Sequence, residues 1–189
     1  MHGKNKTLHP VSFCLIATRF LFESGQYNIA FSMAEDAIVL CGESLTTSKH
    51  PGFSEWYVRD LTSYLYNVQA SITLERVSSD SGLGLHLKIK EIREDNKRPG
   101  NPEDLKWLAA ADGNIAVSLM AESRPEEAYP ILLELLQRKD METNRDIYMS
   151  NICICLIQMQ RLGEALEFCF ESMVVVQQLR GKCSAQMAM

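Results

Sequence analysis

The residue types that carry most enzyme chemistry occur here at spacings that fit no known reaction. Cys153 and Cys155 are two positions apart, so on a helix they point to different faces and cannot form a Cys-x-x-Cys redox pair. Gly82 and Gly84 follow no strand pattern, which argues against a nucleotide-binding loop. The 4 histidines are scattered, and the chain has no phosphate loop, zinc-protease or serine-hydrolase motif. We therefore expect no enzyme, with no catalytic residue, no metal site and no cofactor.

A cluster of cations could contact phosphate groups, and it comprises Lys88, Lys90, Arg93, Lys97 and Arg98. The sequence favours the alternative, a solvated helix face whose cations suit the carboxyl end of the helix. The net charge of −5 also argues against nucleic acid and against an anionic membrane surface as partners. No apolar run approaches the roughly 18 residues that a membrane span needs.

The cysteines and the N-terminus bear on the cellular compartment. Most of the 6 cysteines lie within apolar helical patterns, which favours buried free thiols in a reducing cytosol. The basic start of the chain leads into an apolar stretch that Thr18 and Arg19 interrupt, so it does not read as a signal peptide. The sequence therefore predicts a cytoplasmic protein.

A repeated phrase in the second half of the chain predicts the fold. An Asn-hydrophobic-small triplet begins at Asn114 and again at Asn151, and each copy continues to a Glu-Ala pair that ends at Ala128 or Ala165. Both pairs are offset by 37 residues (151 − 114 and 165 − 128). Self-similarity at a period of about 20–50 residues is typical of repeat arrays, and each unit here reads as helix, short turn, helix.

The pattern resembles the tetratricopeptide repeat (TPR) family. The resemblance is carried by hydrophobic and small residues at matching places, namely Ile115, Ala116, Leu119 and Ala128 in one copy and Ile152, Cys153, Leu156 and Ala165 in the other. The usual period of the family is about 34 residues. An offset of 37 is similar to the longer-spaced arrays of kinesin light chains and of fungal proteins. The resemblance implies an all-α fold, a right-handed superhelix (solenoid) of about four helical hairpins that binds other proteins.

Local signals predict where the repeats begin and end. We expect tails at residues 1–9 and 181–189 around one helical domain, 10–180, with repeats at about 11–42, 54–95, 102–139 and 143–180. Four signals set helix ends: Gly42 as a stop, Ser54 as a cap, Pro102 in a first turn, and a capping box from Ser123 to Glu126. The second repeat departs from the family pattern, with a turn expected at 78–82 and its second helix from Leu83.

Three asparagines match the place at which, in the family, this residue often faces the groove: Asn67, Asn114 and Asn151. There an amide could donate one hydrogen bond to an extended peptide and accept another. The alternative is that each asparagine bonds to a neighbouring helix or to water. The expected neighbours in the groove are Arg19, which is cationic, and four apolar residues, Val117, Met120, Ile154 and Ile157. We therefore predict an apolar peptide or partner helix in the groove, with an enzyme or small-molecule sensor using a concave pocket as the alternative.

The last predicted helix is apolar on more than one side, with the run Met173, Val174, Val175 and Val176. Exposing such side chains to water forfeits roughly 1.5–3 kcal/mol each relative to burial. The final hairpin of a solenoid has no neighbour to cover its outer face. We therefore predict that this face is covered, either by further repeats or by a second copy in a homodimer.

Overall fold

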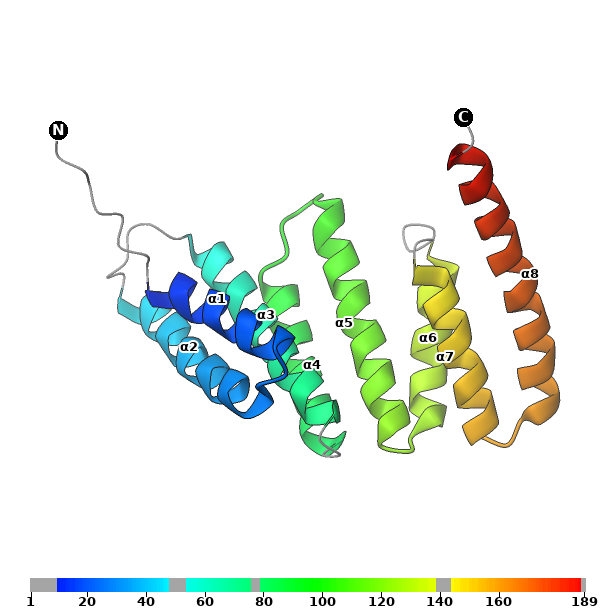
Figure 1. The fold of residues 1–189 in the computed structure, drawn as a ribbon, viewed down its shortest axis with the longest axis horizontal. Helices are drawn as coiled ribbons and strands as arrows, with labels where there is room; N and C mark the ends of the chain where they lie inside the picture. Colours follow the sequence, from blue (N-terminus) through cyan, green and yellow to red (C-terminus); the bar gives the residue numbers. More distant parts are fainter. Residues whose placement is uncertain (1–9, 48–53, 76–78, 139–143, 188–189) are drawn as a thin grey trace. The chain divides into compact units, whose positions relative to one another are not determined.

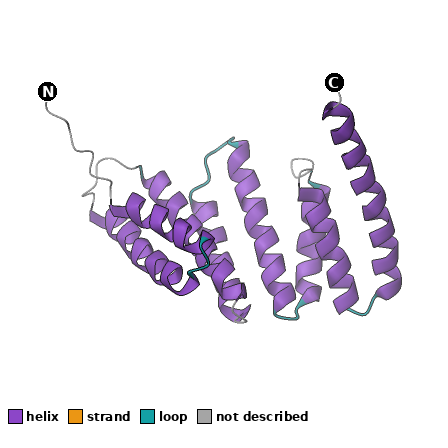
Figure 2. Cartoon of the chain, in the orientation of Figure 1, coloured by secondary structure: helices purple, strands orange, loops and turns teal. Residues whose placement is uncertain are grey.

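The computed structural model describes residues 10–47, 54–75, 79–138 and 144–187, and these residues form helices and turns with no strand among them (Figures 1 and 2). The helices are α1 (Pro10–Glu23), α2 (Tyr27–Thr47), α3 (Glu55–Glu75), α4 (Ser79–Asp95), α5 (Pro102–Ala121), α6 (Pro125–Gln137), α7 (Arg145–Gln158) and α8 (Leu162–Met187). From α1 to α4 and from α5 to α8, helices that follow one another in the chain pack together. The predicted all-α helical repeat fold is confirmed.

The chain divides into two compact units, unit 1 (Met1–Asn101) and unit 2 (Pro102–Met189), each with four helices. The division falls where the sequence opens a helix with Pro102. Gly100, two residues earlier, has a φ of 76°, a conformation that glycine adopts at little steric cost. The single domain predicted for residues 10–180 therefore consists of two compact units.

Three hairpin turns share one backbone geometry. Gly25, Ser123 and Gln160 have positive φ values of 75°, 59° and 60°. In each turn the next residue donates its backbone N–H to a carbonyl five positions back, as Gln26 does to Leu21 at 2.9 Å and as Arg124 and Arg161 do in the other two. This is the Schellman arrangement, which satisfies the last carbonyls of a helix. The turn at Gly25 thus ends α1 in the same way as the other two turns end α5 and α7.

The small residues of the repeat are buried where helices approach closely. Ala116, Ala128, Cys153 and Ala165 are at most 6% exposed. In unit 1 the buried Ala34, Ala37 and Cys41 of α2 pack with Val58, Leu61 and Leu65 of α3. Small side chains allow the two helix backbones to come close, so the repeat pattern in the sequence corresponds to real helix contacts.

Polar contacts join the start of α3 to the end of α4. Asn96 Nδ2 donates to the Trp56 carbonyl at 3.0 Å, and the Arg98 guanidinium lies 4.2 Å from the centre of the Trp56 ring. Arg93 forms an ion pair with Asp60 and is 10% exposed. The cation cluster is therefore not a uniformly solvated face, because Arg93 is half-buried against a carboxylate that the sequence could not place beside it.

Two helix ends differ from the prediction because packing outweighs the helix propensity of glycine. α2 continues through Gly42 to Thr47, since the preceding Cys41 is buried against α3. α4 begins at Ser79, so residues 79–82 are helix and not part of a turn, and Leu83 is buried near its start. A glycine inside a helix costs about 1 kcal/mol relative to alanine, which burial of one large side chain can exceed.

Two further predictions about helix ends are wrong. α8 extends to Met187, so residues 181–187 are helical and not a tail; Lys, Ala, Gln and Met in this segment are good helix formers. The capping box from Ser123 to Glu126 is not formed, because Ser123 ends the preceding turn and Arg124 becomes the N-cap of α6. Ser54 does cap α3, since its Oγ accepts the Tyr57 backbone N–H at 3.3 Å.

Candidate protein-interaction surfaces

Two predicted groove residues belong to unit 1. Arg19 of α1 is exposed and pairs with Glu23, with 2.8 Å between Nε and Oε1, and this hydrogen bond raises the pKa of Arg19. Asn67 of α3 is half-buried, and its Nδ2 donates to the Ser63 carbonyl one turn earlier at 3.2 Å. The guanidinium is thus partly neutralised by its own helix, and the Asn67 amide group is already engaged within α3.

The other two asparagines lie at equivalent places in unit 2. Asn114 of α5 and Asn151 of α7 are both half-buried, and α5 contacts α7. Asn114 interacts with other residues of the protein. The Asn151 side chain makes no hydrogen bond with any residue that the structure describes. Asn151 is therefore the predicted groove asparagine whose amide is best able to bind a partner.

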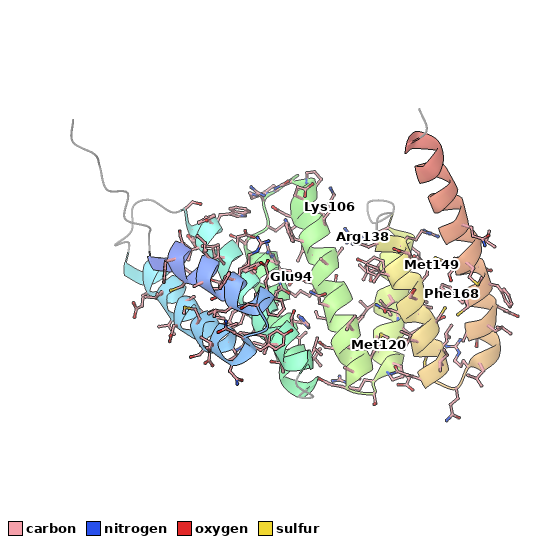
Figure 3. All side chains as sticks on the ribbon, viewed as in Figure 1. Glu94, Lys106, Met120, Arg138, Met149 and Phe168 are labelled. Atoms are coloured by element: carbon pink, nitrogen blue, oxygen red, sulfur yellow. The ribbon has the colours of Figure 1, made fainter. Side chains whose placement is uncertain are left out.

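The apolar residues predicted around these asparagines differ in exposure. Val117, Ile154 and Ile157 are 38%, 44% and 52% exposed. Met120, labelled in Figure 3 near the end of α5, is only 8% exposed, and its carbonyl accepts Gln158 Nε2 of α7 at 3.3 Å. The Met120 side chain is therefore buried, whereas that of the equivalent Ile157 is exposed to solvent.

The buried thiols of α7 are poor nucleophiles. Burial raises the pKa of Cys153 to about 12, with a contribution from a hydrogen bond with Cys169, and raises that of Cys155 to about 11. A thiol with such a pKa stays protonated near neutral pH, and the thiolate is the reactive form. Cys14, Cys41, Cys153, Cys155 and Cys169 are all free thiols.

Unit 1 contains a hollow of about 490 Å³ between α2 and α4, with α3 as its floor. Gln69 on this floor is 4% exposed, and its amide makes no hydrogen bond with the described residues. Lys88 on the α4 wall lies 5.7 Å from the centre of the Tyr66 ring, and Glu35 lines the α2 wall. The sequence did not reveal this hollow, because its lining comes from three helices and follows no common spacing.

Helix α8 carries an exposed apolar stripe. Leu162, Leu166, Phe170, Met173 and Val174, spaced mostly four residues apart, are 53–63% exposed. Two of the four residues predicted for self-association, Met173 and Val174, belong to this α8 stripe, while the side chains of Val175 and Val176 lie outside the description. The other three members could have been found from their four-residue spacing on a helix. Phe168, labelled in Figure 3, is half-buried and lies off the stripe.

Repeated helical hairpins joined by equivalent turns define a helical repeat protein of the solenoid class. No family model and no curated protein matches the chain. Among solved structures, two crystal structures of a kinesin light chain-like protein of Podosopora anserina, built from nearly identical TPR-like repeats, are similar to it. One is 12% identical with a TM-score of 0.52, and the other, a point variant of the same protein, is 13% identical with a TM-score of 0.53.

Each match covers 92% of this chain and 99% of the matched chain. The chain therefore has a TPR-like fold, as the 37-residue repeat predicted. Among the helices that the structure describes, none is both long enough and apolar enough to cross a membrane.

Proposed function

We propose that this chain is a protein-interaction scaffold, and that unit 2 binds an extended peptide or a partner helix along α5 and α7. The observation that carries the proposal is Asn151, a half-buried amide without a hydrogen-bond partner among the described residues. It lies one turn from Ile154 and two from Ile157, both exposed. The TPR-like fold supports the proposal, because such arrays typically present a surface for protein partners.

In the proposed complex the Asn151 amide donates to a carbonyl of the partner and accepts from an N–H, which gives affinity without reading sequence. Val117, Ile154 and Ile157 cover an apolar side chain of the partner. None of these three side chains carries a charge that could pair with a carboxylate of the partner. The preferred partner segment is therefore apolar and not acidic.

The experiment begins with capture of partners from the native host and their identification by mass spectrometry. A peptide from the captured protein is then titrated calorimetrically against the wild type and Asn151→Ala. We expect a loss of about 1–3 kcal/mol in binding free energy, because a desolvated amide pair is removed. Asn67→Ala is the matched control, since that amide is engaged within α3. Equal affinity for Asn151→Ala and the wild type, with a lower melting temperature, would make Asn151 a structural residue.

A non-catalytic role in the cytoplasm belongs to the same proposal. Cys153 and Cys169 are near enough for their thiols to share a hydrogen bond, yet both are free. Neighbouring free thiols suit a reducing compartment. Fractionation of host cells with an antibody to the chain tests the location, and recovery in a secreted or oxidising compartment would contradict it.

We also propose that the α8 stripe mediates self-association through the C-terminal hairpin. The supporting observation is five large apolar side chains on one helix, each more than half exposed. Surfaces of this kind mark interaction sites in soluble proteins. Light scattering over a range of concentrations measures the association, and Met173→Glu should abolish it.

A further inference from the structure

Within unit 2, the second helix of one hairpin packs on the first helix of the next, and α6 provides this surface for α7. Pro125 of α6 is buried, and Tyr129, Leu133 and Leu136 are half-buried. The Arg161 guanidinium, just after α7, lies 5.3 Å from the centre of the Tyr129 ring. At the other end of α7, Arg145 Nη1 donates to the Leu136 carbonyl at 3.2 Å.

The α8 stripe is the same surface one repeat later. Adding 37 residues to the four α6 positions gives Leu162, Leu166, Phe170 and Met173, which are 63%, 60%, 61% and 58% exposed. The offset is fixed by the equivalent turns at Ser123 and Gln160. The exposed stripe of α8 therefore corresponds to the surface of α6 that packs on α7, and no described residue covers it.

The surface that α7 offers to α6 also occurs a second time. A Cβ atom built on Gly113 of α5 would lie 3.3 Å from Tyr148 Cε1 and 3.8 Å from Leu135 Cδ1, so Tyr148 reaches between α5 and α6. The negative charge of Glu126 in α6 contributes to the raised pKa of Cys155, which lies two turns later in α7. Tyr148 and Cys155 are 5% and 0% exposed.

The turns at Gly25 and Gln160 relate α1 to α7 by 135 residues (160 − 25). The α1 counterparts of Tyr148 and Cys155 are therefore Phe13 and Phe20, which are 60% and 66% exposed. Two aromatic rings thus stand in solvent at positions that the repeat buries elsewhere. They are the apolar residues that an α8-like surface would cover.

We infer that α1 of a second copy docks on the α8 stripe, as α7 docks on α6, so that copies associate head to tail. The inference rests on the proposed self-association, and it identifies α1 as the surface of the second copy that the α8 stripe binds. The surfaces on the two sides differ, so the contact is heterologous and assembly can continue beyond a dimer.

Charge favours this contact over an α8–α8 pair. Glu167 and Glu171 are exposed on the flank of the stripe, and a twofold antiparallel α8 pair would place the two acidic flanks side by side. Residues 10–22 contain no Asp or Glu, so α1 brings no like charge to this flank until Glu23, which is paired with Arg19.

Complementation between two single variants tests the inference on untagged full chains. Phe20→Glu disables the α1 surface and Phe170→Glu disables the α8 stripe, each at an exposed position, so the monomer should keep its helicity and melting temperature. Analytical ultracentrifugation should find each variant monomeric at concentrations where the wild type exceeds the mass of two copies. Mixed together, the two should form a 1:1 dimer, because one intact surface of each kind remains.

We expect each glutamate to weaken association by roughly 100-fold or more, since the contact would bury a carboxylate that has no partner. The double variant Phe20→Glu/Phe170→Glu is the control and should not dimerise with itself. If Phe20→Glu still dimerises and Phe170→Glu does not, α8 pairs with itself; self-association then stands and the head-to-tail contact is overturned. A wild type that stays monomeric at all concentrations overturns both.

Discussion

Arg93 of α4 forms an ion pair with Asp60 of α3 across the second hairpin, and the two side chains are 10% and 32% exposed. The pair spans 33 positions in the sequence and lies beside the Asn96–Trp56 hydrogen bond. A charge removed from water in this way depends on its partner, because the partner replaces the lost hydration.

Asp60→Asn should therefore lower the free energy of unfolding by about 1.5–3 kcal/mol, the range for a hydrogen bond to a charged group. Urea denaturation followed by circular dichroism measures the change. Glu55→Gln is the control, because its pair with Arg59 is on the surface, and it should cost less than about 1 kcal/mol. Equal effects of the two changes would mean that burial adds nothing to the Arg93–Asp60 pair.

The left-handed turn residues give a second prediction. Ser123 and Gln160 are exposed and occupy a conformation that costs a non-glycine residue about 1–2 kcal/mol. Glycine removes this strain but loses more entropy on folding, so Gln160→Gly should stabilise by about 0.5–1 kcal/mol. Gly25→Ala, the reverse change in the equivalent turn, should destabilise by a similar amount. Thermal melts of both variants measure the change in melting temperature, which should rise for Gln160→Gly and fall for Gly25→Ala. Two changes in the same direction would contradict the equivalence of the turns.

The hollow of unit 1 gives a third prediction. Gln69 is 4% exposed and lines the hollow, so Gln69→Leu, which keeps the volume but replaces the amide with apolar atoms, should raise the free energy of unfolding by about 1 kcal/mol. Gln69→Ala should lower it, because it leaves a cavity. Chemical denaturation distinguishes the two. A Gln69→Leu protein less stable than the wild type would show that the amide is satisfied in solution.

Buried His86 predicts a dependence of stability on pH. Desolvation lowers its pKa from 6.5 to about 4, and the residue is 4% exposed. Since the folded-state pKa lies below the unfolded value, the contribution of neutral His86 to the free energy of unfolding is fully present above pH 6.5. It is lost as the pH falls from there through about 4. The loss over this window is on the order of 3 kcal/mol.

Urea titrations at several pH values between about 7 and 4 measure this slope. His86→Leu removes the titrating ring, so its free energy of unfolding should fall less steeply over the same range than that of the wild type. Parallel curves for the two proteins would show that other groups cause the dependence.

The sequence by itself determined the repeat and hence the fold. The small residues Ala116, Ala128, Cys153 and Ala165 had to recur because two helices can approach closely only where side chains are small. The helix starts at Ser54 and Pro102 were also predictable, since capping and a first-turn proline depend on neighbours in the chain.

Only the tertiary structure decided which residues are accessible and which charges are paired. Met120 and Ile157 occupy equivalent positions in the sequence, yet the first is 8% exposed and the second is 52% exposed. In the sequence, Arg93 does not differ from the other cations of its helix; its ion pair with Asp60 of α3 exists only in the tertiary structure. Likewise, Phe13 and Phe20 match residues that are buried in α7 but remain exposed in α1. Burial and pairing depend on which helix lies opposite, and periodicity within one helix cannot specify that.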